Sequence, residues 1–221
     1  METAKALSVL FVAVSVAFAA AAYSSLPDVI VTHWNAAGEP NGAMQKAFGL
    51  GVFPVLAVFL LILFRALPSI DPLNQGYKNF RAKYDWFVAG ILAFIVLIEL
   101  LVIAWNFGLQ VGFGSLLSAA FAALLYGVGW LLSGVKRNWF VGIRTPWTLS
   151  SESVWDKTHA LGGKLFKAAG VLMLAGVVVP QYAVGLVLAL AVGPSALLVA
   201  YSYMEFRREQ RGKRRALPGA S

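Results

Sequence analysis

Three adjacent residues in the first third of the chain, His33, Trp34 and Asn35, have side chains suited to binding. The histidine ring and the asparagine amide can exchange hydrogen bonds, and the indole combines a large apolar face with one N–H donor. Such a group can grip a peptide or a lipid headgroup. The alternative is that Trp34 only anchors its segment at an interface while His33 satisfies backbone groups. The residues alone leave both interpretations open.

A second candidate is Arg144, in a segment that is also rich in polar, aromatic and turn-forming residues. A guanidinium can hold a phosphate or a carboxylate through two parallel hydrogen bonds. Arg144 can equally well pair with Glu152, eight residues further on.

Glu99 is a third candidate because it stands inside a long apolar run. An ionisable side chain in the interior of a membrane span is costly and marks a functional site by default. The alternative is a protonated or hydrogen-bonded carboxyl that holds the helices together, with Tyr126 or Ser118 as its expected partner. A transporter would use Glu99 to bind a solute or an ion.

Catalytic and metal-binding patterns are missing from the sequence. The chain has no cysteine and two histidines, His33 and His159, which the topology below places on opposite sides of a membrane. A histidine-based metal site is therefore not expected, and no H-E-x-x-H, G-x-S-x-G or phosphate-binding loop is present. We predict no catalytic residues, metal or cofactor. A membrane enzyme would need scattered side chains such as Arg144, Glu152 and His159 to surround one cavity.

The elements that must position these residues are membrane spans. Of the 221 residues, 59% are hydrophobic and 13% are charged, against about 45–50% and 25% in soluble domains. The last apolar run covers about 39 residues, or about 58 Å of helix, so it must fold back, and Pro180 is the expected place. The first run is either a span or a signal peptide. About six spans are predicted in the apolar runs Ala6–Tyr23, Ala47–Leu67, Trp86–Trp105, Gly114–Gly134 and Leu165–Tyr203.

Lysine and arginine predict the orientation. Apart from Lys46, they fall at Lys5, in the segments Arg65–Lys83 and Lys136–Lys167, and at Arg207–Arg215 in the tail 205–221. The signature inner loop is segment 135–164. The positive-inside rule makes these parts and both termini cytoplasmic, and segment 24–46 extracytoplasmic. The basic tail fits anionic headgroups better than nucleic acid. We expect a two-span unit over 1–84 and a four-span unit over 85–221.

Two further features concern the later spans. Ser150 or Ser151 can cap a helix that begins with Glu152, and we expect a short interfacial helix there before the fifth span. Small residues recur every fourth position in two spans, a pattern that lets helix backbones approach closely. We therefore expect bundle seams at Ala119, Ala123 and Gly127 and at Gly185, Ala189 and Gly193.

The two polar loops together resemble a known family. The outer loop reads Leu26-Pro27-Asp28, Thr32-His33-Trp34-Asn35, Gly38-Glu39-Pro40 and Lys46. The inner loop reads Arg137-Asn138, Gly142-Ile143-Arg144-Thr145-Pro146-Trp147-Thr148-Leu149, Glu152, Val154-Trp155, Thr158-His159 and Gly162-Gly163. These stretches resemble the amino-terminal domain of unknown function and the carboxy-terminal signature of the SdpI family of bacterial membrane proteins, whose members are expected to have six spans.

The resemblance implies a non-enzymatic immunity and signalling protein of the cell membrane. It would resist a membrane-active toxin peptide outside and draw a repressor-type regulator to the membrane inside. The alternatives are a small-solute or ion transporter centred on Glu99 and an envelope- or lipid-related enzyme. The expected outer binding residues are Asp28, His33, Trp34, Asn35, Gly38 and Lys46. The expected inner ones are Arg137, Asn138, Gly142, Arg144, Thr145, Pro146, Trp147, Glu152, Trp155 and His159.

Overall fold

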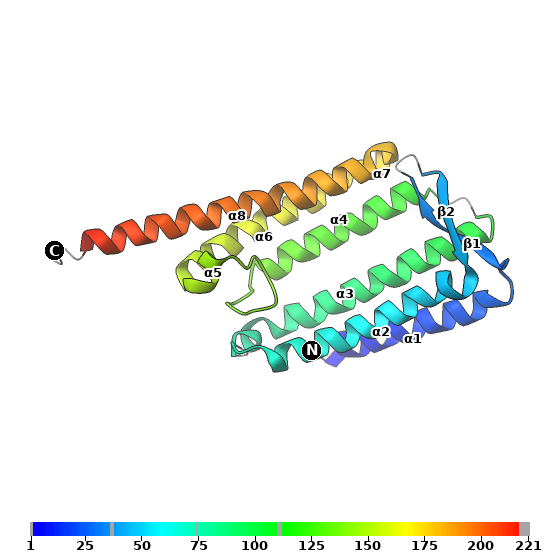
Figure 1. Ribbon diagram of the computed structural model, residues 1–221, viewed down its shortest axis with the longest axis horizontal. Coiled ribbons are helices and arrows are strands. Elements are labelled where there is room, and N and C mark those ends of the chain that lie inside the picture. Colours follow the sequence, from blue (N-terminus) through cyan, green and yellow to red (C-terminus); the bar gives the residue numbers. More distant parts are fainter. Residues whose placement is uncertain (1, 36–37, 74, 110–111, 217–221) are drawn as a thin grey trace.

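Six helices of the computed structural model are long and apolar enough to cross a membrane. The structure describes residues 2–35, 38–73, 75–109 and 112–216, without the side chains of 75, 76 and 214–216. The long helices run side by side, a β-hairpin lies across one end of the bundle, and a short helix and its loop lie at the other (Figure 1). The long helices are α1 (Glu2–Tyr23), α2 (Lys46–Ile70), α3 (Gln75–Asn106), α4 (Phe113–Leu132), α6 (Glu152–Met173) and α8 (Ala183–Ala216).

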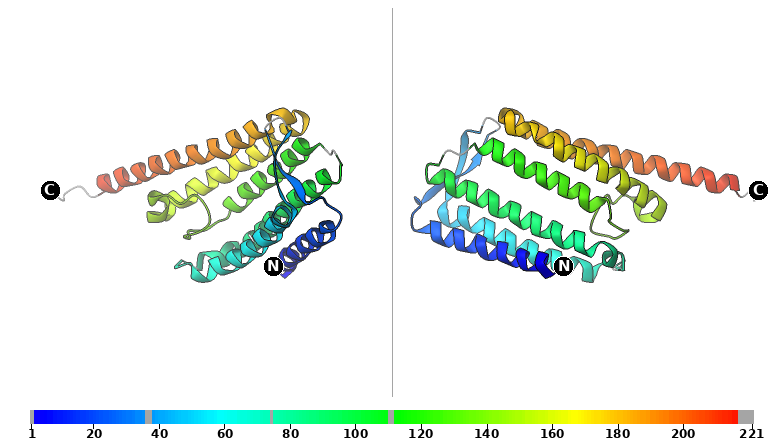
Figure 2. Two further views of the ribbon diagram at one scale, coloured as in Figure 1. Left: turned by 45° about the vertical axis from the view of Figure 1, so that its right-hand side comes forward. Right: turned by 180° about the vertical axis from the view of Figure 1, so that it is seen from behind.

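The spans predicted from hydropathy are confirmed. The long apolar run near the C-terminus does fold back, through α7 (Ala175–Val178) and the 3-10 turn η1 (Pro180–Tyr182). Helix α8 continues through the basic tail as far as Ala216 and projects beyond the other helices (Figure 1). The start of α1 and the end of α8 lie towards the end of the bundle that carries the inner loop, as an even number of spans requires (Figure 2).

The bundle is two groups of three helices. Helix α1 packs against α2 and α3, and α6 packs against both α4 and α8. The α3–α4 pair joins the groups. Each group therefore carries one of the two polar loops, the hairpin between α1 and α2 and the inner loop between α4 and α6.

The closest seam lies between α4 and α6. A Cβ added at Gly129 would lie 2.5 Å from the backbone nitrogen of Lys167, and one at Gly170 would lie 2.7 Å from that of Tyr126. The backbones can approach this closely only because neither glycine has a side chain.

The two seams predicted from small residues are wrong. Gly185, Ala189 and Gly193 are exposed, and no atom lies within 4 Å of a Cβ added at either glycine. Ala119 and Ala123 are exposed as well, and Gly127 is half-buried, with only a Phe87 ring carbon, at 3.8 Å, near an added Cβ. Lipid is as apolar as a neighbouring helix, so spacing alone cannot tell a packed face from one that faces lipid.

The helix predicted at Glu152 is present, with its N-terminus capped by the Ser151 hydroxyl, which accepts from the Val154 N–H at 3.3 Å. It continues to Met173 as the fifth span itself and is not a separate interfacial helix. No proline interrupts it, and its buried face packs on protein. The short helix that precedes it is α5 (Pro146–Ser150), which the sequence did not predict.

Candidate functional site

The outer loop folds as a β-hairpin, which the sequence did not predict. Strands β1 (Val29–Trp34) and β2 (Pro40–Gln45) are antiparallel, with Val31 opposite Ala43. At the turn, the Asn35 amide donates to the Glu39 carboxylate at 2.9 Å, and Gly38 adopts a φ of 81°. Residues 36 and 37 of this loop lie outside the described part of the chain.

The hairpin is fixed to the bundle at two points. The Asn106 side chain, at the end of α3, accepts from the Val31 N–H at 2.8 Å and donates to the Val31 carbonyl at 2.9 Å, as a neighbouring strand would. Ile30 is fully buried, and its Cδ1 would lie 2.7 Å from a Cβ added at Gly49 of α2. The hairpin is therefore a rigid cap on α2 and α3, and Asn106 is a positioning residue that the motifs did not reveal.

Trp34 contributes to the same anchoring. Its ring stacks on Phe113 with centroids 4.5 Å apart and meets Trp105 edge-on at 5.6 Å. The side chain therefore joins the hairpin to the ends of α3 and α4. Removing it would disturb the hairpin as well as any surface that the hairpin presents.

His33 and Asp28 are the exposed members of the predicted outer group. The His33 Nδ1 lies 2.9 Å from the Thr32 hydroxyl. Lys46 forms an ion pair with the exposed Asp28 at 3.1 Å and lies over the Tyr23 ring. The predicted residues Asp28, His33, Asn35 and Lys46 thus occur on one small folded unit, with Trp34 beneath it.

In the inner loop, Asn138 is a buried organising residue. Its Oδ1 accepts from the backbone N–H groups of Phe140 at 2.9 Å and Val141 at 2.6 Å. Its Nδ2 donates to the carbonyls of Lys136 and Val141 at 2.8 and 2.9 Å. One side chain therefore satisfies most of the polar backbone of this turn. Such a residue shapes the loop from inside.

His159 is also buried, and both of its ring nitrogens are bonded. Nε2 accepts from the Ile143 N–H at 2.9 Å, so Nδ1 carries the proton and donates to the Trp155 carbonyl at 2.7 Å. The ring stacks on Trp155 at 4.0 Å. Gly142, with a φ of 115°, passes so close that an added Cβ would lie 2.4 Å from Nε2. The predicted group Gly142, Trp155 and His159 therefore closes the loop onto α6.

The exposed residues of the inner loop are different ones. Arg144 and Glu152 are exposed and form no ion pair with each other within the described residues; Arg144 donates to the Trp139 carbonyl at 3.0 Å. Trp139 is 50% exposed. Arg144, Glu152 and His159 therefore do not converge on one cavity. Among the described residues, no group of three histidine, cysteine or acidic side chains could hold a metal ion.

The remaining inner residues tie the loop to α8. Thr145 starts α5 through a capping box with Thr148, and its hydroxyl lies 3.2 Å from the Ser202 hydroxyl. Trp147 packs against Tyr203 with ring centroids 5.0 Å apart. Arg137 donates to the Leu149 carbonyl at 3.3 Å, and Pro146 is exposed.

Acidic residues of α8, which the motifs did not single out, complete this contact. Glu205 is buried and binds Lys157 at 2.9 Å and Arg208 at 2.5 Å. The Glu209 carboxylate accepts from the Ser151 hydroxyl at 2.5 Å. The tail is thus partly charge-paired and serves as a support for the inner loop.

Glu99 lies at the contact of α1 and α3. It is fully buried, and its Oε2 accepts from the Ser15 hydroxyl of α1 at 2.5 Å. Within the described residues Oε1 has no partner. The expected partners are wrong, since Ser118 bonds to the Gly114 carbonyl and Tyr126 is exposed. The sequence did not indicate that Ser15 and Glu99 form a pair, because they are 84 positions apart.

Six apolar helices with polar structured loops at both ends define a multi-pass integral membrane protein. Residues 134–203 match the SdpI/YfhL protein family, and residues 10–58 match a domain of unknown function, DUF1648. The carboxy-terminal part of the chain therefore carries the SdpI/YfhL family domain, and its amino-terminal part carries DUF1648. The Immunity protein SdpI of Bacillus subtilis (strain 168) is 21% identical over 167 residues, 76% of this chain and 78% of that protein. No solved structure matches the chain.

Proposed function

We propose that this protein confers immunity to a membrane-active toxin peptide and passes the signal to a cytoplasmic regulator. The observation that carries the proposal is the outer hairpin, a rigid unit that exposes His33 while Asn106 and Ile30 hold its backbone. The similarity to a protein named as an immunity protein supports the same conclusion. A structural linker between two spans needs neither a sheet nor an asparagine bridge.

The hairpin offers mixed chemistry to a peptide. Val29 and Met44 are 58% and 43% exposed, and His33 adds hydrogen-bonding nitrogens. An amphipathic peptide lying at the membrane surface carries both apolar and polar side chains. Such a peptide would meet the hairpin before it enters the bilayer beside the protein.

Survival of sensitive cells tests the outer surface. Cells that express the chain are challenged with a panel of membrane-active peptide toxins, alongside cells expressing His33→Ala or Gln45→Ala. Gln45 is the matched control because it is exposed on the same hairpin. We expect protection by the unaltered chain and by Gln45→Ala, and its loss in His33→Ala at equal membrane abundance. Full protection by His33→Ala would refute the outer-surface role.

For the inner surface, we propose that Trp139 and Arg144 bind the regulator. They are exposed neighbours joined by a hydrogen bond, and tryptophan and arginine dominate protein-binding hot spots. A photocrosslinking residue at 139 should capture a soluble cytoplasmic protein, with less capture in Arg144→Ala. The matched control is the same crosslinker at the exposed position Ala160. Equal capture from both positions would contradict this site.

Transport remains a second candidate because of one observation, the buried Glu99 carboxyl with its Ser15 partner. A transporter centred on Glu99 would lose flux into vesicles in Glu99→Gln. An immunity protein would keep its protection in the same variant. Vesicle flux and toxin protection, both measured on Glu99→Gln, therefore distinguish the two functions.

A further inference from the structure

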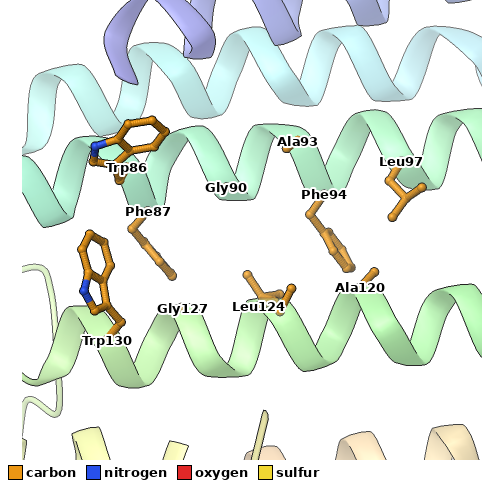
Figure 3. A pocket seen from close by; sticks show the side chains of 11 residues that line it. Trp86, Phe87, Gly90, Ala93, Phe94, Leu97, Ala120, Leu124, Gly127 and Trp130 are labelled. Carbon is orange, nitrogen blue, oxygen red and sulfur yellow. The ribbon is translucent and has the colours of Figure 1, made fainter. Parts of the chain in front are cut away.

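A groove on the membrane-spanning surface lies apart from both polar loops. Its deeper part is a cavity of about 330 Å³ between α3 and α4, lined by apolar side chains (Figure 3). A second cavity of about 640 Å³ continues from it across α4 towards α6. The two share Trp86, Ala123, Gly127 and Trp130.

The groove is open because small residues form its surface. No atom lies within 4 Å of a Cβ added at Gly90, and only a Phe87 ring carbon, at 3.8 Å, approaches one at Gly127. Phe87 and Phe94 point into the space between the helices, and Trp86 and Trp130 stand together at one end (Figure 3).

The length of the groove selects its occupant. From Ala120 to Trp130 its floor on α4 covers about 15 Å at 1.5 Å per residue. One leaflet contributes about half of a hydrocarbon core of about 30 Å. A transmembrane helix of a partner would need the whole thickness, whereas a single acyl chain needs one leaflet.

Two lysines lie near the end marked by the tryptophans. The Lys83 ammonium lies 5.5 Å from the centroid of the Trp130 ring. The backbone nitrogen and Cγ of Lys167 on α6 would lie 2.5 and 2.8 Å from a Cβ added at Gly129, one residue before Trp130, so the flexible Lys167 side chain starts beside this end of the groove. Within the described residues neither lysine has a carboxylate partner. Paired tryptophans mark the headgroup level, and basic pockets between spans on the cytoplasmic side bind anionic headgroups.

We propose that this groove is a binding site for an anionic phospholipid of the cytoplasmic leaflet. One acyl chain lies along α4 between Phe87 and Phe94, and the phosphate is held by Lys83 and Lys167. The uncompensated charge at the rim selects an anionic headgroup over a zwitterionic one. The site is independent of the proposed immunity role.

Native mass spectrometry of the purified full-length chain, titrated with phosphatidylglycerol or phosphatidylcholine, tests the proposal. We expect phosphatidylglycerol to bind at least tenfold more tightly than phosphatidylcholine. Each lysine near the phosphate should raise the affinity for the anionic lipid about fivefold. The double variant Lys83→Gln/Lys167→Gln should lose this preference. Its control is Lys78→Gln, an exposed lysine on the same helix.

Gly90→Leu tests the acyl-chain part of the site. The leucine enters open space, so the fold tolerates it, and binding of both lipids should fall. Gly193→Leu on α8 is the control, because that position is equally open but lies outside the groove. The proposal is overturned if the wild-type chain binds both lipids equally, if the lysine variant keeps its preference, or if Gly90→Leu binds as wild type. If the chain forms a dimer that Gly90→Leu disrupts, the groove holds a second copy of the chain and not a lipid. That result would also overturn the proposal.

Discussion

The two histidines of this chain lie in the two polar loops and have opposite surroundings. His33 is exposed on the outer hairpin, with the Thr32 hydroxyl beside its Nδ1. His159 is 1% exposed, stacks on Trp155 and uses both ring nitrogens for backbone bonds. The same residue type can therefore meet a ligand in one loop and hold the fold together in the other.

This difference extends to the rest of each loop. The inner loop keeps its shape through buried side chains, Asn138 and His159 above all, and presents Arg144 and Trp139 outwards. The hairpin keeps its shape through backbone pairing and takes its support from Asn106 on another helix. A signature motif thus mixes residues that shape a loop with residues that can bind.

Gly142→Ala should give the largest effect. The methyl group would overlap His159 Nε2, and a φ of 115° is unfavourable for alanine. We expect the free energy of unfolding to fall by about 3 kcal/mol, seen as a lower thermal unfolding temperature in detergent. Gly193→Ala, at an open position, is the control. An unchanged unfolding temperature in Gly142→Ala would show that the inner loop is not held by this contact.

Asn106→Ala should come next, because it removes the bridge that fixes the hairpin. The Val31 N–H and carbonyl would lose their side-chain partner, at a cost of about 2 kcal/mol. We expect faster amide hydrogen exchange in β1 and weaker toxin protection. Asn41→Ala, on the exposed strand β2, is the matched control. Unchanged amide hydrogen exchange in β1 would show that the Asn106 side chain does not stabilise the hairpin.

Glu99→Gln probes the bundle between the two loops. Glutamine keeps the acceptor for Ser15 and removes a carboxyl that is costly inside a membrane. We expect the unfolding free energy to stay equal or to rise by about 1 kcal/mol, and toxin protection to persist. Ser15→Ala, in contrast, removes the hydrogen bond that Glu99→Gln keeps. Loss of protection in a stable Glu99→Gln protein would favour the transport function.

His33→Ala should have the smallest effect on stability, within about 0.5 kcal/mol, because the side chain is exposed. His159→Ala, in contrast, would leave the Ile143 N–H without its acceptor and should lower the unfolding temperature clearly. Thermal unfolding of the two variants side by side measures the contrast. Equal losses would mean that the outer histidine is also structural.

Part of the candidate site could be predicted from sequence. The two loops could be recognised by their polar composition and their position between apolar runs. A cap by Ser150 or Ser151 was predicted at Glu152, and Ser151 provides it. Which residues of each loop are exposed could not be predicted. Burial of Asn138 and His159 depends on backbone groups that reach them only when the loop has closed on α6.

The sequence by itself determined the six spans and the fold-back at Pro180, because hydropathy and proline act locally along the chain. Only the tertiary structure decided that Glu99 pairs with Ser15 and that Asn106 supports the hairpin. It also decided that the close α4–α6 contact uses Gly129 and Gly170, while the Gly185 and Gly193 stripe faces outwards. The physical reason is that lipid and helix are equally apolar, so the choice of partner rests on shape and hydrogen bonds between residues far apart in sequence.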